Sequence, residues 1–156
     1  MTATPWPDLA GRLIEGGHAH ILPVRVYFED TDFSGVVYHG GYIRFMERGR
    51  SDYLRLLGVG HDALARGEYA DGEQLAFAVT RIVADFRKPA RIDEVIEVVT
   101  RAASVGGARI VLSQTIRRDD LLLVSAEVTV VMVNAAGQAR RLPGIVREML
   151  RLADDA

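Results

Sequence analysis

A short polar segment in the first third of the chain carries the residues best suited to chemistry. Asp32 is separated by six residues from His39, and the pair Gly40 and Gly41 follows at the start of a predicted helix. An aspartate can act as a general base or a nucleophile, and a histidine can orient a substrate, a water molecule or the carboxylate. Glycines leave backbone N–H groups accessible at a helix N-terminus, where the helix dipole stabilises negative charge on a carbonyl oxygen. The alternative is an acidic turn that only caps the helix.

Other chemical motifs are weaker or absent in the sequence. The run from Asp30 to Gly35 imitates the start of a calcium loop, but the twelfth loop position is Gly41 instead of the required glutamate. His18 and His20 have no cysteine or nearby acidic partner, so their spacing is more typical of solvated histidines than of a metal site. The motifs of serine hydrolases, Walker loops and dinucleotide-binding loops do not occur. The sequence therefore predicts neither a metal site nor a cofactor.

The composition is that of an ordinary globular chain. Of 156 residues, 49% are hydrophobic and 26% are charged, and the net charge of -2 argues against a broad basic surface for nucleic acid. Cysteine is absent, which excludes disulfides and thiolate chemistry and fits a reducing compartment. Neither a signal peptide nor a membrane-spanning run is visible. We expect one cytoplasmic domain over residues 1–156, with its core at about 20–148 and no membrane insertion.

Hydrophobic periodicity predicts the elements that must position the polar segment. A strand is expected over about 20–28, and a long amphipathic helix over about 41–57. Gly49 lies on the apolar stripe of that helix, where a glycine allows another backbone to approach closely. Shorter helices are expected after Pro7, over 61–66 and after Pro143. Four strands with short connections predict an antiparallel meander, and hence an α+β fold in which the sheet packs on the helix: 75–86, 94–102, 108–117 and 121–133.

Four segments carry a resemblance to a known family: RVYFEDTDFSGVVYHGGY at 25–42, ERGR at 47–50, FAVTR at 77–81 and PARIDEV at 89–95. They closely resemble the YbgC-like branch of the 4-hydroxybenzoyl-CoA thioesterase family, and the likeness extends over about 22–148. The resemblance implies the hotdog fold, an antiparallel β-sheet wrapped around a long central α-helix. It also implies hydrolysis of an acyl-CoA thioester to a carboxylate and free CoA.

The resemblance assigns roles to individual residues. Asp32 is implied as the catalytic carboxylate and His39 as the active-site histidine, with Tyr38 and Gly40 at the substrate. Backbone amides near His39 and Gly40 would polarise the thioester carbonyl. Phe28 departs from the family pattern, since a tyrosine often stands there. The sites of this family lie between two subunits, which implies a homodimer or a tetramer.

Three points stay open from the sequence alone. The densest basic turn contains Arg87, Lys88 and Arg91, which suit the phosphates of CoA or form a solvated turn. Phe77 and Val79 are candidates to line an acyl pocket, but the acyl group itself is not predicted. The alternatives to hydrolysis are a hotdog hydratase or dehydratase, and a non-catalytic partner that binds acyl-CoA or an acyl carrier.

Overall fold

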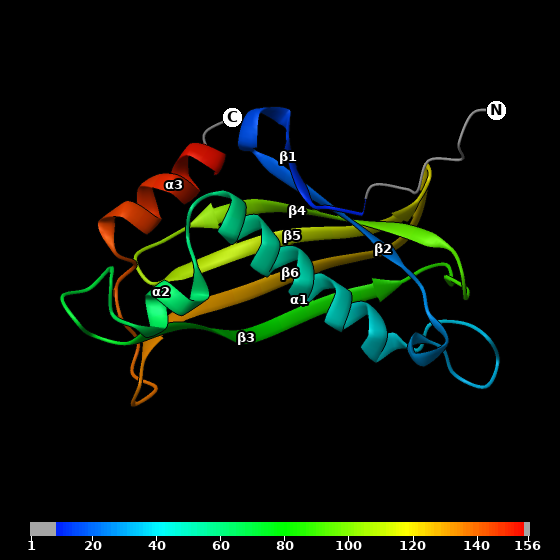
Figure 1. Ribbon diagram of the computed structural model, residues 1–156, viewed down its shortest axis with the longest axis horizontal. Coiled ribbons are helices and arrows are strands. Elements are labelled where there is room, and N and C mark those ends of the chain that lie inside the picture. Colours follow the sequence, from blue (N-terminus) through cyan, green and yellow to red (C-terminus); the bar gives the residue numbers. More distant parts are fainter. Residues whose placement is uncertain (1–8, 155–156) are drawn as a thin grey trace, which may run out of the picture.

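A computed structural model describes residues 9–154 and places one antiparallel sheet against one long helix (Figure 1). The sheet has the strand order β1-β2-β4-β5-β6-β3. The strands are β1 (Arg12–Ile14), β2 (Ala19–Arg25), β3 (Leu75–Phe86), β4 (Val95–Val105), β5 (Arg109–Arg118) and β6 (Leu121–Asn134). The helices are α1 (His39–Leu56), α2 (His61–Ala65) and α3 (Gly144–Asp154), and two 3₁₀ turns are η1 (Glu15–Gly17) and η2 (Phe28–Asp30). This is the expected α+β hotdog arrangement.

Helix α1 lies across one face of the sheet, and its predicted apolar stripe is buried (Figure 1). A Cβ atom on Gly49 would lie 2.9 Å from Val98 Cγ1 and 3.1 Å from Thr100 Oγ1. The close approach predicted at Gly49 is therefore present, although side chains of β4 make it and not a backbone. The helix begins at His39, two residues earlier than predicted, because Tyr38 has an extended backbone and serves as the N-cap. None of the helices in the described residues is long and apolar enough to cross a membrane.

The strand order corrects the predicted four-strand meander. β4, β5 and β6 are consecutive neighbours, but β3 pairs with β6 and not with β4. The segment between β3 and β4 therefore crosses the end of the sheet and is not a hairpin. The backbone hydrogen bonds of this segment show its path. At its start, the backbone N–H groups of Arg87 and Lys88 donate to the carbonyl of Leu123 in β6. At its end, the backbone N–H of Asp93 donates to the carbonyl of Val26, which follows β2. Turn-forming residues indicate where a strand ends, but not which strand is its partner.

The end of β2 also differs from the sequence prediction. The strand ends at Arg25 and not near residue 28, because Asp30 closes a turn: its Oδ2 accepts a hydrogen bond of 2.9 Å from the N–H of Tyr27. Phe28, the residue that departs from the family pattern, lies in this turn and is exposed.

The predicted surface role of His20 is wrong. The side chain is fully buried in β2, with Nε2 2.7 Å from Asp52 Oδ2, and its ring stacks on Tyr53 of α1. Burial lowers the pKa of His20, and the hydrogen bond with Asp52 acts in the opposite direction. His20 is a core residue because α1 covers its strand. The helix expected after Pro7 is not seen in the described residues 9–18, where β1 and η1 are found, and residues 1–8 lie outside the described part.

Candidate active site

The loop between β2 and α1 is tied to the segment that follows β3. Val36 forms a β-bridge with Arg91, and the N–H of Val37 donates to the carbonyl of Ala90 at 2.9 Å. The N–H of Ala90 in turn donates to the hydroxyl of Tyr42 in α1 at 2.8 Å. The loop that carries Asp32, the basic turn and the start of α1 thus form one connected framework.

The N-terminus of α1 presents backbone N–H groups that the helix itself does not use. The N–H of Gly41 donates to the Tyr38 carbonyl at 2.9 Å, but those of His39 and Gly40 have no acceptor among the described residues, and the side chain of Tyr38 supplies none. A Cβ on Gly40 would lie 2.5 Å from the Tyr38 ring, and one on Gly41 would lie 2.9 Å from Val37 Cγ1. A side chain at either position would therefore force the neighbouring Tyr38 or Val37 side chain to move. The free N–H groups and the helix dipole together form a site suited to a negatively charged oxygen.

Asp32 is exposed in the loop before this helix and is ionised at neutral pH. Its Oδ1 accepts two hydrogen bonds from Ser34, one from the backbone N–H at 2.8 Å and one from the hydroxyl at 2.5 Å. These bonds lower the pKa of Asp32, because they stabilise the charged carboxylate. The neighbouring Asp30 differs in kind, since it is 6% exposed and its carboxylate caps the turn at Tyr27.

His39 faces a cavity of about 240 Å³ at the start of α1. The residues that line it are Val37, His39, Tyr42, Phe86, Arg87, Lys88 and Pro89. The His39 ring lies edge-on to Tyr38, at 5.8 Å between centroids, and to Phe86, at 6.2 Å. The structure therefore brings His39, Tyr38 and two of the three predicted cationic residues together. Asp32 does not line this cavity, and no hydrogen bond joins it to His39 within the described residues.

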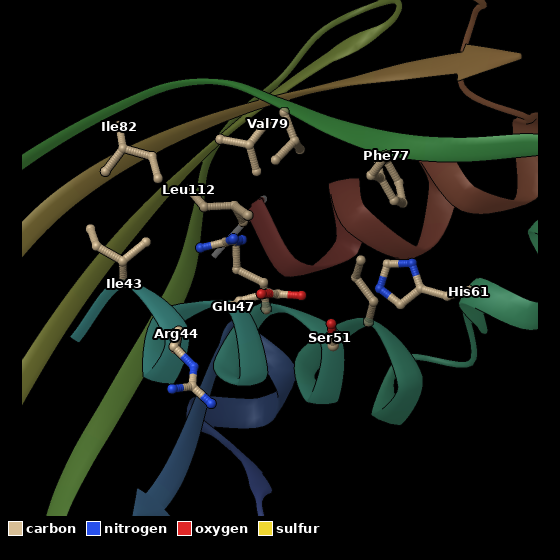
Figure 2. Close-up of a pocket in the computed structure, with 12 residues that line it drawn as sticks. Ile43, Arg44, Glu47, Ser51, His61, Phe77, Val79, Ile82 and Leu112 are labelled. Carbon is tan, nitrogen blue, oxygen red and sulfur yellow. The ribbon is translucent and has the colours of Figure 1, made fainter. Parts of the chain in front are cut away.

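A second cavity, of about 290 Å³, lies between the middle of α1 and β3 (Figure 2). Its apolar lining is Ile43, Leu54, Phe77, Val79, Ile82, Leu112 and Val130, and its polar lining is Arg44, Glu47, Arg50, Ser51 and His61. The predicted pair Phe77 and Val79 is part of this wall, but sequence reasoning missed the polar residues. The spacing of Glu47, Arg50 and Ser51, at three and four residues, would have placed them on one face of the helix. Among the described residues, no group of three acidic or histidine side chains is placed to hold a metal ion.

Known proteins share both the sequence and the fold of this chain. It matches the Thioesterase-like superfamily over residues 26–151. The chain belongs to this superfamily. The acyl-CoA thioesterase YbgC of Haemophilus influenzae is 41% identical over 113 residues, which are 72% of this chain and 79% of that relative. The family resemblance carried by the sequence motifs is thereby confirmed.

Solved structures extend the comparison of this superfamily member to the fold. A probable thioesterase from Bartonella henselae is similar with a TM-score of 0.77 and 43% identity, covering 80% of this chain and 99% of that one. A 1,4-dihydroxy-2-naphthoyl-CoA thioesterase from Synechocystis is 18% identical and has a TM-score of 0.73, covering 85% of this chain and 96% of that one. At that identity the likeness concerns the fold alone.

The hydrogen bonds of Asp32 predict the effect of Ser34→Ala. The substitution removes the hydroxyl donor and keeps the backbone N–H donor, so the pKa of Asp32 should rise toward its ordinary value. Titration of the carboxyl carbon by nuclear magnetic resonance measures the change. Ser51→Ala is the control, because this serine lies on α1 and has no hydrogen bond to Asp32. An unchanged titration of Asp32 in Ser34→Ala would contradict the assignment.

Proposed function

We propose that this protein is a cytoplasmic acyl-CoA thioesterase that hydrolyses the thioester to a carboxylate and free CoA. The observation that carries the proposal is the ionised Asp32 in the loop directly before the free N–H groups of α1. The relatives named above are thioesterases, which favours hydrolysis over a hydratase, a dehydratase or a non-catalytic binding partner. The cysteine-free sequence suits a reducing compartment and supports the cytoplasmic location.

Thioester hydrolysis matches this small set of groups. An alkyl thiol has a pKa of about 8.5, so its thiolate leaves without a strong general acid. The backbone N–H groups of His39 and Gly40 donate to the thioester carbonyl oxygen as it becomes negative, which lowers the barrier to attack. Asp32 supplies the negative charge, either as the nucleophile or as the base that activates water. In both roles it must be ionised, as its lowered pKa ensures at neutral pH.

Asp32→Asn tests the proposed mechanism. The substitution keeps the shape of the side chain but removes the charge, so kcat should fall by about 10²–10⁴-fold, the usual contribution of a general base, or by more. The measurement is thiol release from a panel of acyl-CoA esters, with and without EDTA, alongside circular dichroism to verify folding. EDTA is expected to have no effect.

Asp30→Asn is the matched control for this experiment. An asparagine oxygen can still accept the N–H of Tyr27, so the turn should persist and most activity should remain. A folded Asp32→Asn protein with near-normal kcat, or an equal loss in Asp30→Asn, would contradict the role of Asp32.

The basic turn is proposed to bind the phosphates of CoA. Arg87 and Lys88 line the same cavity as His39, which brings cationic groups next to the reaction site. Arg91 is joined to the loop of Asp32 through the β-bridge at Val36. All three side chains are exposed, and none forms an ion pair within the described part of the chain. Their charges are therefore free to meet an anionic ligand.

Charge removal in this turn should affect substrates unequally. In Arg87→Gln/Lys88→Gln the KM for an acyl-CoA should rise severalfold, because the phosphates lose their partners. The KM for the matching pantetheine thioester, which lacks the nucleotide, should change little. Steady-state kinetics on the two substrates gives the change in KM for each, and hence the ratio of the two changes. Equal increases for both substrates would remove the turn from the phosphate site.

The free edge of β3 supports a homodimer, alone or paired into a tetramer. β3 pairs with β6 on one side and with no other strand of the described residues on the other. It is twelve residues long, and Val79 and Val83 are 46% and 45% exposed. A long apolar edge strand is a template for pairing with another copy. Antiparallel pairing of two β3 strands would place the sites between subunits.

A lysine on β3 should break this dimer. In Val83→Lys, like charges are brought together where the two edges pair, so the protein should become monomeric and lose most of its activity. Light scattering at micromolar concentration measures the mass. Ile145→Lys on α3 is the control, since Ile145 is 49% exposed and lies away from β3. A fully active wild-type monomer would contradict the shared site.

A further inference from the structure

The cavity beside β3 contains a buried charge that the proposed reaction does not use. Arg50 is 8% exposed, lines this cavity, and donates from Nη1 to Gln114 Oε1 at 3.0 Å. Gln114 is held in turn, because its Nε2 donates to the Met46 carbonyl at 2.9 Å and to Thr100 Oγ1 at 2.8 Å. The other N–H groups of the guanidinium have no acceptor among the described residues. Gln114 thus holds the guanidinium of Arg50 in place beside the cavity, with N–H donors left for a ligand.

The charges around Arg50 do not neutralise it. Glu47 lies on the same wall and attracts Arg50, but the two form no ion pair within the described residues. Arg44 also borders the cavity, and its side chain points away from it (Figure 2). A buried charge without a charged partner is costly, and an anion that enters the cavity would compensate it.

The remaining walls indicate what accompanies that anion. Phe77 and Val79 on β3 face α1 across the cavity, and Ile43 lies on the helix side (Figure 2). Leu54 of α1 also lines the cavity. A chain of methylene groups suits these walls, and a carboxylate at its end suits Arg50. We propose that Arg50 selects acyl-CoA substrates whose acyl group ends in a carboxylate, that is, monothioesters of dicarboxylic acids. This inference rests on the proposed thioesterase function and deepens it.

The direction of β3 explains how a short acyl group reaches Arg50. Within one chain, the eleven helical steps from His39 to Arg50 span about 16.5 Å, which is longer than a short acyl chain. Phe86 packs against His39 at one end of β3, and Phe77 packs against His61 at the other end. In the proposed β3 dimer, the reaction end of the partner subunit therefore lies near Phe77 and His61. The acyl group enters the cavity from that end.

The experiment compares two substrates that differ only at the end of the acyl chain. Glutaryl-CoA and pentanoyl-CoA have equal numbers of acyl carbons, and only the first has a terminal carboxylate. For the wild-type protein, kcat/KM should be at least about 10-fold higher for glutaryl-CoA, as expected for a charge-assisted hydrogen bond. In Arg50→Met this ratio should fall to one or below, mainly through KM. Arg48→Met, which removes an exposed arginine of the same helix, should leave the ratio unchanged.

Further measurements separate this inference from the proposed function. Non-hydrolysable thioether analogues of both esters give the same comparison as dissociation constants, without turnover. Arg50→Gln is a second neutral variant that can still hydrogen-bond Gln114, should Arg50→Met fail to fold. Hydrolysis of acyl-CoA esters with no preference for the carboxylate, or with a preference that both Arg50 variants retain, would overturn the inference and leave the thioesterase intact. A carboxylate preference in binding that Arg50 controls, without hydrolysis of any ester, would support the site and contradict the reaction.

Discussion

The contact between α1 and the sheet at Gly49 fixes the distance between the two layers. Val98 and Thr100 of β4 occupy the space that a side chain at this position would need. The helix consequently lies low enough for Gln114 of β5 to reach both the Met46 carbonyl and the guanidinium of Arg50. A helix held further from the sheet would lose this network, because hydrogen bonds weaken steeply with distance and angle. The cavity beside β3 depends on the same spacing, since α1 forms one of its walls.

The position of α1 along its axis is set at its N-terminal end. The hydroxyl of Tyr42 accepts the N–H of Ala90, and the N–H of Val37 donates to the carbonyl of Ala90. The crossing segment after β3 thereby holds both the helix and the loop that precedes it. An exposed loop gains a defined geometry from such backbone bonds, which is what the proposed role of Asp32, as nucleophile or as base, requires. The two hydrogen bonds that Asp32 accepts from Ser34 within its own turn also restrict the carboxylate.

Local patterns in the sequence predicted most elements but not their partners. The bounds of β3 and the apolar stripe of α1 follow from periodicity, and the motif around Asp32 and His39 identified the family. The pairing of β3 with β6 and the burial of His20 did not follow, because both depend on contacts between residues far apart in the chain. The polar wall of the cavity was missed for a related reason. Its residues lie on the flank of α1 beside the apolar stripe, and only the packed sheet shows that they enclose a space.

In the proposed mechanism the two cavities have different roles, one in binding CoA and one in selecting the acyl group. A thioester needs little assistance to break, so a carboxylate and a helix terminus would suffice at the proposed reaction end, where Arg87 and Lys88 line the same cavity as His39. Selection among acyl groups requires a contact that the wrong substrate cannot make. A buried guanidinium meets this requirement well, because an aliphatic acyl chain would leave its charge uncompensated in an apolar space. In the proposed site, the stability that the fold loses by burying Arg50 is regained as discrimination between acyl groups.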